Sequence, residues 1–166
     1  MKRRTVLTAI SVTLAGLAAP SAILAQGTKS IIGSWIPVSA VVTDPSGKKT
    51  NAFGDAPRGV LVFMPDGRYT LTIMEGSLPK FASNNRAKGT PEENRAVVAG
   101  SIAHIGKYSV DEKENTLTFH VETSTYANWE GQSQKRVFSV SKDELRYKVA
   151  AASVGGSAEL VWKRVK

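Results

Sequence analysis

The sequence contains no cysteine. Disulfide bonds, thiol catalysis, zinc–thiolate sites and iron–sulfur clusters are therefore excluded. It also has no nucleotide-binding fingerprint and no recognisable Ser/His/Asp spacing, and Gly155-Gly156 fits a hairpin turn rather than a phosphate loop. Internal repeats are absent. The sequence therefore contains no motif that indicates a particular reaction.

The chain also lacks an apolar run long enough for a comfortable membrane span of about 20 residues. Its N-terminus instead has a basic start, a mild apolar run and a small-residue end, AILAQ. This order predicts a secretory signal peptide over residues 1–25, with cleavage after Ala22 as the alternative and an uncleaved anchor as a further one. Arg3-Arg4 resembles a twin-arginine signal, and an ordinary Sec signal remains equally open. We therefore expect a periplasmic or secreted protein.

Cleavage would leave residues 26–166, which is 141 residues and one domain by size. Removing the three cations Lys2, Arg3 and Arg4 from a net charge of +8 leaves +5. Such a charge suits solubility and could favour anionic ligands or an anionic membrane surface. The basic residues are dispersed, so we expect no nucleic-acid partner.

The dominant hydrophobic period of the mature chain is two, which is typical of strands. Turn signals such as Pro65-Asp66-Gly67 separate eight predicted strands: 33–43, 59–64, 68–74, 101–110, 116–124, 132–140, 144–150 and 157–165. Residues 26–30 are predicted to be a disordered leader and 44–57 a long polar loop. Helical signals gather only in 76–100, where Thr90, Pro91 and Glu93 predict a short helix over 91–99. The stretch before it, 76–90, is predicted to be a mobile flap.

Short connections between regularly spaced strands favour antiparallel neighbours. The fold class is therefore all-β, an eight-stranded antiparallel up-and-down barrel with one short helix. A barrel of this size is filled by side chains or holds one small ligand.

Gly33-Ser34-Trp35 resembles the G-x-W signature of lipocalins and their calycin relatives. The longer stretches APRGVLVFMPDGRYTLTIM and AHIGKYSVDEKENTLTFHVETSTYANWEGQSQKRVFSV, with LVWKRV, resemble the bacterial lipocalin-like domain family. The resemblance covers nearly all of the mature chain and implies that Trp35 plugs one end of the barrel beneath Trp162, Lys163 or Arg164. It extends to Pro57-Arg58-Gly59, His120, Glu122, Asn128-Trp129 and Arg136, whereas His104 stands where the family more often has an aromatic residue.

The strand 116–124 carries Leu117, Phe119 and Val121 on one face and His120 and Glu122 on the other. For an isolated strand the apolar face would turn inward. The neighbouring strands each mix polar and apolar groups on one face, namely Ile102, His104, Gly106 and Tyr108, and Gln134, Arg136, Phe138 and Val140. We therefore expect His120, Glu122, Arg136 and Tyr108 in a wet lumen. A polar network that only rigidifies the barrel is the alternative.

Four further residues are candidates. His104 could join His120 and Glu122 in a metal set, but the spacing is not diagnostic and no metal or cofactor is predicted. Trp129 and Asn128 could cover a ligand at the mouth, or pack on the wall and form a turn. Arg58 could meet an anionic head group, or pair with Asp55 or Asp66.

We thus expect an exported barrel that binds a small, partly apolar ligand, and the polar part of this ligand could be an anionic group. The predicted ligand-binding residues are Arg58, His104, Tyr108, His120, Glu122, Asn128, Trp129 and Arg136. The alternatives are a barrel enzyme, of isomerase, cyclase or hydratase type, using His120 or Glu122 as acid–base group, and a filled structural or interaction module.

Overall fold

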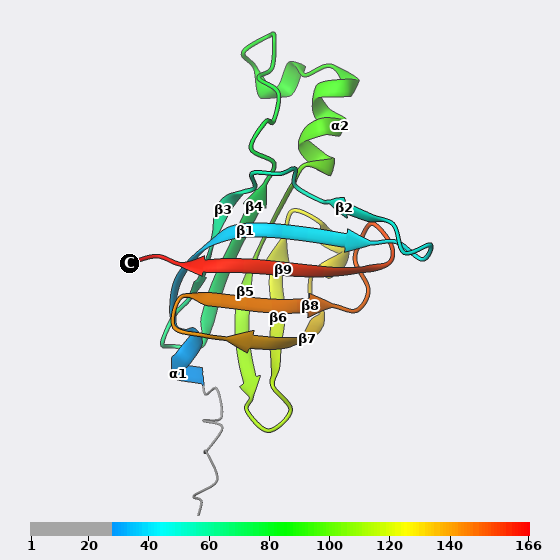
Figure 1. Ribbon diagram of the computed structural model, residues 1–166. Coiled ribbons are helices and arrows are strands. Elements are labelled where there is room, and N and C mark those ends of the chain that lie inside the picture. Colours follow the sequence, from blue (N-terminus) through cyan, green and yellow to red (C-terminus); the bar gives the residue numbers. More distant parts are fainter. Residues whose placement is uncertain (1–27) are drawn as a thin grey trace, which may run out of the picture.

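Antiparallel strands dominate the computed structural model, which describes residues 28–166 (Figure 1). The predicted signal peptide lies outside these residues. The strands are β1 (Gly33–Thr43), β2 (Lys49–Asn51), β3 (Arg58–Phe63), β4 (Arg68–Met74), β5 (Ser101–Asp111), β6 (Thr116–Ser124), β7 (Ser133–Val140), β8 (Glu144–Val149) and β9 (Ser157–Arg164).

Eight of these strands close into a ring. Each strand from β3 to β9 pairs antiparallel with the next, and β1 pairs with β3 on one edge and with β9 on the other. β3 pairs only with the first residues of β1, Gly33–Trp35, and the short β2 pairs with its last residues, Val41–Thr43. The predicted closed barrel of eight antiparallel strands is therefore confirmed.

The strand and helix bounds agree with the predicted ranges to within one residue at each end. The helix α2 (Pro91–Ala99) has the expected capping box: Thr90 Oγ1 accepts a hydrogen bond from the Glu93 amide, and the Glu93 carboxylate accepts one from the Thr90 amide. Two predictions were wrong. The loop 44–57 contains β2, and helix α1 (Thr28–Ile31) begins inside the predicted disordered leader.

One end of the barrel is closed by Trp35, which is fully buried. Its indole N–H donates a hydrogen bond of 2.8 Å to the carbonyl of Ile31 in α1. The Arg164 guanidinium lies over the ring and donates to the carbonyls of Ser30 and Ile32. Of the three partners left open by the sequence, Arg164 is thus the one that covers Trp35.

The half of the lumen next to this plug is packed with rings. Phe63, Tyr69, Tyr108 and Phe119 are buried and contact one another edge-on or stacked, with ring centroids 4.7 to 5.9 Å apart. Such packing leaves no room for a ligand at this end.

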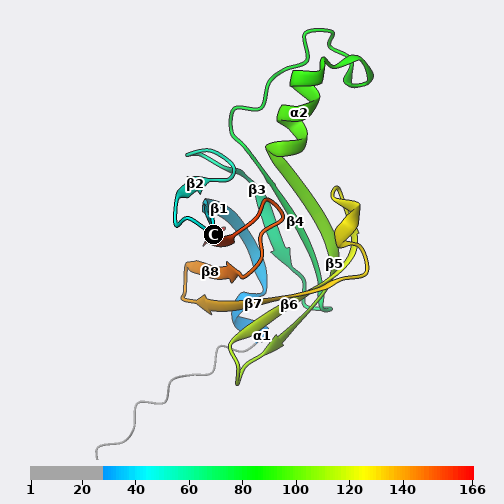
Figure 2. The same cartoon turned by 90° about the vertical axis from the view of Figure 1, so that its right-hand side faces the viewer.

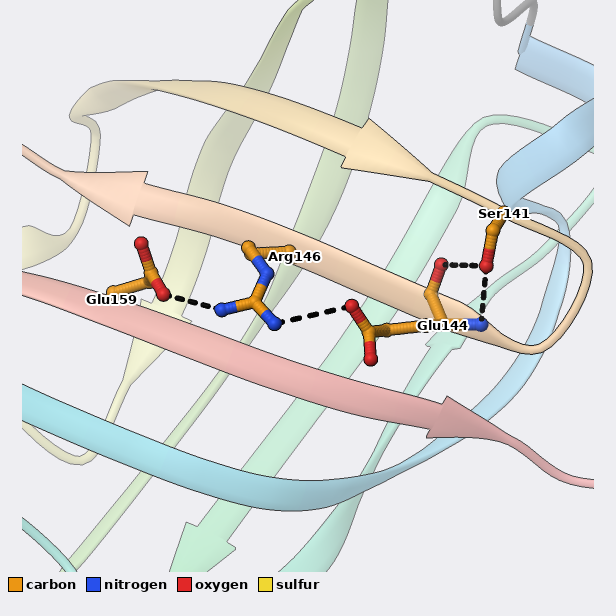
Figure 3. Close-up of polar contacts among 4 residues, drawn as sticks. All are labelled: Ser141, Glu144, Arg146 and Glu159. Atoms are coloured by element: carbon orange, nitrogen blue, oxygen red, sulfur yellow. Dashed lines mark hydrogen bonds and ion pairs between the residues drawn. The ribbon is translucent and has the colours of Figure 1, made fainter.

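The outer wall carries a row of charged side chains. On β8 and β9, Arg146 donates to Glu159 at 2.5 Å and to Glu144 at 3.2 Å, and Ser141 Oγ accepts from the Glu144 amide (Figure 3). This chain of charges follows the alternation expected of a sheet with one face in water.

The connection between β4 and β5 leaves the barrel and carries η1 (Arg86–Lys88) and α2 (Figures 1 and 2). Neither helix buries a residue. A backbone hydrogen bond from Glu75 to Gly100 joins the two ends of the connection. No helix in the described part of the chain is long and apolar enough to cross a membrane.

Candidate functional site

The half of the barrel away from Trp35 holds a cavity of about 580 Å³. Its walls are mostly apolar and come from both β-sheet and loops. The strands supply residues such as Leu71, Ile73, Phe119 and Leu160, and the rim includes Val98 of α2 and Trp129 of η2 (Ala127–Trp129). A cavity of this size and composition suits a small, partly apolar molecule.

Arg136 is the cation of this cavity. It stands on β7, where its direct neighbour across the ladder is the buried Leu117, so its side chain shares the inner face. Its Nη2 donates to Gln134 Oε1 at 2.6 Å and its Nη1 to the carbonyl of Lys135 at 2.9 Å. Within residues 28–166 it forms no ion pair, and no Asp or Glu lines the cavity.

Burial lowers the pKa of Arg136 from its ordinary value. That ordinary value lies far above neutrality, and a guanidinium keeps its charge inside proteins. The cavity therefore contains a positive charge, with three of its five N–H donors unused by the described protein groups.

His104 and Tyr69 form the second polar feature. Tyr69 Oη and His104 Nδ1 are 2.7 Å apart, and both residues are buried. Burial, helped by the nearby Arg136, lowers the pKa of His104 to about 4, and burial raises the pKa of Tyr69. Both side chains are therefore neutral at neutral pH. The pair offers hydrogen bonds rather than charge to the cavity that His104 lines.

The described chain matches the family model of the lipocalin-like domain over residues 32–165. The chain belongs to the lipocalin-like domain family. No curated protein gave a match. The fold of a lipocalin-like barrel supports ligand binding in general, without indicating which ligand.

The prediction that His120 and Glu122 face the lumen is wrong for this lipocalin-like barrel. His120 pairs with Lys107 across the ladder, and both lie on the outer wall, where the ring is 3.0 Å from Ser109 Oγ and 2.9 Å from Ser133 Oγ. Glu122 forms a 2.6 Å ion pair with Arg68, with both side chains about 40% exposed (41% and 42%). The apolar face of β6 turns inward instead, with Leu117, Phe119 and Val121 buried.

Tyr108 is inside, but in the packed half: its hydroxyl donates to the Met64 carbonyl and its ring packs on Phe63. It does not line the cavity in the part of the chain that the structure describes. Because His104 and His120 lie on opposite faces, the metal set of His104, His120 and Glu122 does not converge. No group of three or more metal-ligating side chains occurs in residues 28–166.

Of the candidates in loops and at strand ends, Trp129 lines the cavity, whereas Asn128 and Arg58 do not. Trp129 lines the cavity and meets the His104 ring edge-on, with centroids 5.6 Å apart. Asn128 is exposed, and its carbonyl accepts a hydrogen bond from Gln132 in the turn. Arg58 is exposed outside the lumen and donates to the Gly76 carbonyl at 2.5 Å. The structure thus brings together Arg136, His104 and Trp129, and leaves Arg58, Tyr108, His120, Glu122 and Asn128 outside the cavity.

Three polar residues near Arg136 were not predicted as site residues: Tyr69, Gln134 and Tyr147. Gln134 and Tyr147 line the cavity, and Tyr69 holds the His104 ring. Their signal was present in the sequence, because each alternates with outward residues on its strand and shares the inner face with buried residues, Leu71 and Ile73 for Tyr69, Phe138 and Val140 for Gln134, and Leu145 for Tyr147.

Proposed function

We propose that this protein binds a small, partly apolar molecule in its lumen and that an anionic group of the ligand pairs with Arg136. The observation that carries the proposal is a half-buried guanidinium in a cavity whose described lining contains no carboxylate. An unpaired cation in such surroundings costs free energy. A carboxylate or sulfonate on the ligand would offset that cost through charge-assisted, bidentate hydrogen bonds.

The remaining walls fit the rest of such a molecule. Phe119, Tyr147 and Trp129 offer ring surfaces, and Leu71 and Ile73 offer aliphatic surface. The neutral His104 can form one hydrogen bond with a polar atom beside the apolar part. Trp129 and the segment 76–90 would cover the mouth.

Two fluorescent probes that differ in one group test the charge requirement. 1-Anilinonaphthalene-8-sulfonate carries a sulfonate, and N-phenyl-1-naphthylamine has the same rings without it. We expect the Arg136→Gln variant to lose about 10- to 100-fold in affinity for the anionic probe and little for the neutral one, since a hydrogen bond to a charged group contributes about 1.5–3 kcal/mol.

Arg68→Gln is the matched control, because it removes a guanidinium from the outer wall and should leave both affinities unchanged. Equal losses for the two probes in Arg136→Gln would contradict a role in anion recognition, as would an anionic-probe loss in Arg68→Gln. Native mass spectrometry of the purified protein would then identify the class of any molecule that co-purifies.

We also propose that the barrel works outside the cytoplasm, after removal of residues 1–25. The basic, apolar and small-residue order of that segment supports this. An intact mass that retains Met1–Ala25 on protein recovered from cells with a working export system would contradict it.

The two alternatives have less support. The acid–base enzyme rested on His120 and Glu122, which lie on the outer wall. The filled module conflicts with a cavity of about 580 Å³.

A further inference from the structure

The polar side chains of the cavity gather at its floor, the side next to the packed half of the barrel. On β5, β7 and β8 the cavity-lining residue nearest the Trp35 end is polar in each case. The next inward residue along each strand is buried and lies outside the cavity. The floor residues are His104, Arg136 and Tyr147, and the buried residues beyond them are Gly106, Phe138 and Leu145.

The wall between the floor and the mouth is mostly apolar. One step closer to the mouth, β4, β5 and β8 present Ile73, Ile102 and Val149. Gln134 on β7 is the exception, and its side-chain oxygen accepts a hydrogen bond of 2.6 Å from Arg136. Among the residues of 28–166 that line the cavity, only Arg136 carries a charge at neutral pH. The charge of the cavity is therefore placed at its floor.

The hydroxyl of Tyr147 belongs to the same floor as Arg136. Tyr147 is 3% exposed, and burial raises the pKa of its hydroxyl, whereas the nearby Arg136 charge and the Trp162 indole N–H act in the opposite direction. Both neighbours are hydrogen-bond donors, and the buried Trp162 N–H has no partner of standard hydrogen-bond geometry in residues 28–166. The hydroxyl oxygen thus has donors around it, and its own proton is left for an acceptor in the cavity.

A carboxylate on the floor would use both groups. One of its oxygens can accept from the N–H groups that Arg136 leaves unused, and the other can accept from the Tyr147 hydroxyl. An apolar tail would then extend along the apolar wall to the opening. The opposite orientation fits less well, because it leaves Arg136 without a counterion and offers the carboxylate only neutral groups at the rim, such as the hydroxyl of the 41% exposed Tyr126.

We propose that the ligand is a monocarboxylic acid with one apolar tail, that its carboxylate lies on the floor between Arg136 and Tyr147, and that its tail points to the mouth. The inference rests on the proposed function and adds to it the class of acid, its orientation and a binding role for Tyr147. A second charged group at the far end of the molecule would lie against the apolar wall, where an unpaired charge costs free energy. Dicarboxylic acids of the same length therefore bind more weakly.

Isothermal titration calorimetry with straight-chain acids tests the class of ligand. From hexanoic to octanoic acid, each added methylene should raise the affinity about fourfold, because it is buried against the apolar wall. Octanedioic acid should bind at least about tenfold more weakly than octanoic acid, because its second carboxylate finds no partner. Octanamide has the same length and no charge, and it should bind about 10- to 100-fold more weakly.

Two tyrosines of the cavity form a matched pair that tests the orientation. Tyr147→Phe removes a hydroxyl from the floor and should weaken octanoic acid binding about tenfold, because a hydrogen bond to a charged group is lost. Tyr126→Phe removes the same group from the rim and should leave this affinity unchanged. The loss in Tyr147→Phe should be smaller for octanamide, which separates a lost contact with the carboxylate from a general disturbance of the cavity.

Nuclear Overhauser contacts report the orientation without any substitution. In the complex of the unmodified protein with octanoic acid, the terminal methyl group should give contacts to the methyl groups of Ile102 and Val149. The methylene next to the carboxylate should give contacts to the Tyr147 ring. The reverse pattern would overturn the proposal, as would a larger loss of affinity in Tyr126→Phe than in Tyr147→Phe.

The remaining outcomes distinguish this inference from the proposed function. Octanoic acid binding that Arg136→Gln weakens and Tyr147→Phe does not, or equal affinities for octanoic and octanedioic acid, would overturn the inference and leave anion pairing at Arg136 in place. The same holds if none of these acids binds while 1-anilinonaphthalene-8-sulfonate binds in an Arg136-dependent way. Affinities for octanoic acid and for that probe that Arg136→Gln leaves unchanged would overturn both.

Discussion

The guanidinium of Arg164 lies 4.0 Å from the centroid of the Trp35 ring, and these residues belong to the last and first strands of the barrel. The contact therefore stands at the seam where β1 and β9 close the ring. Arg164 also donates hydrogen bonds to the carbonyls of Ser30, Ile32 and Lys142, which ties α1 and the β7–β8 turn to the same point.

We expect Arg164→Ala to lower the free energy of unfolding by about 2–4 kcal/mol, because it removes a cation–π contact and the part-buried hydrogen bonds to the carbonyls of Ser30 and Ile32. Urea unfolding followed by tryptophan fluorescence measures this. Lys163→Ala, at the exposed neighbouring position, should cost less than about 0.5 kcal/mol. Equal effects of the two substitutions would mean that Arg164 does not hold the seam.

A second prediction concerns Gly59 at the start of β3. Its φ is +146°, and an added Cβ would lie 2.0 Å from the Thr72 carbonyl oxygen of the paired strand. The backbone of β4 cannot retreat without breaking its own ladder, so Gly59→Ala should destabilise by more than about 3 kcal/mol.

Gly131→Ala is the comparison at a positive φ without a close contact. Gly131 also has a positive φ, +76°, but nothing lies within 4 Å of an added Cβ. This control should cost only about 1 kcal/mol from its conformation. Thermal unfolding of the two variants side by side measures the difference, and equal losses would contradict the larger penalty expected at Gly59.

The strands and α2 could be predicted from the sequence because their signals are local. Alternation marks each strand, Pro65-Asp66-Gly67 marks a hairpin, and Thr90 with Glu93 caps the helix. The short β2 could not be predicted in this way. Its three residues, Lys49, Thr50 and Asn51, are exposed and polar, and they are a strand only because β1 extends past the end of β3.

The inner faces of β5 and β7 were predicted correctly and that of β6 was not. Residues that face each other in neighbouring strands lie on the same side of the sheet, and this rule decides the three faces together. Choosing the Tyr108 face of β5 and the Gln134 face of β7 as inner was correct, and both residues pair with Phe119. That pairing requires the Phe119 face of β6 to turn inward, which places His120 outside. The polar side chains of the lumen, His104, Gln134, Arg136 and Tyr147, come from β5, β7 and β8, whereas β6 contributes Phe119.

A third prediction follows from the outward position of Glu122. Its ion pair with Arg68 is exposed to solvent and should contribute little to stability. Glu122→Gln should change the free energy of unfolding by less than about 1 kcal/mol and leave the affinity for 1-anilinonaphthalene-8-sulfonate unchanged. A large loss of affinity in titrations with this variant would return Glu122 to the ligand site.

The last prediction concerns the response of the barrel to acid. The pKa of His104 falls from 6.5 to about 4 on folding, mainly because burial disfavours the charged imidazole. Below about pH 6.5 the unfolded chain takes up a proton that the folded chain does not, so the free energy of unfolding falls as pH falls towards 4. The loss from this residue amounts to about 2–3 kcal/mol and ends once both states are protonated.

His104→Gln has no such proton to gain, so its loss of stability between neutral pH and about pH 4 should be smaller than that of the unmodified protein by about 2 kcal/mol. The carboxylates remain in both proteins, and their contribution cancels in the comparison. Urea unfolding at both pH values, with the His104 ring titrated by NMR, measures the difference. Parallel stability curves for the two proteins would mean that the imidazole is solvated, and the cavity wall at Tyr69 and His104 would then be open to water.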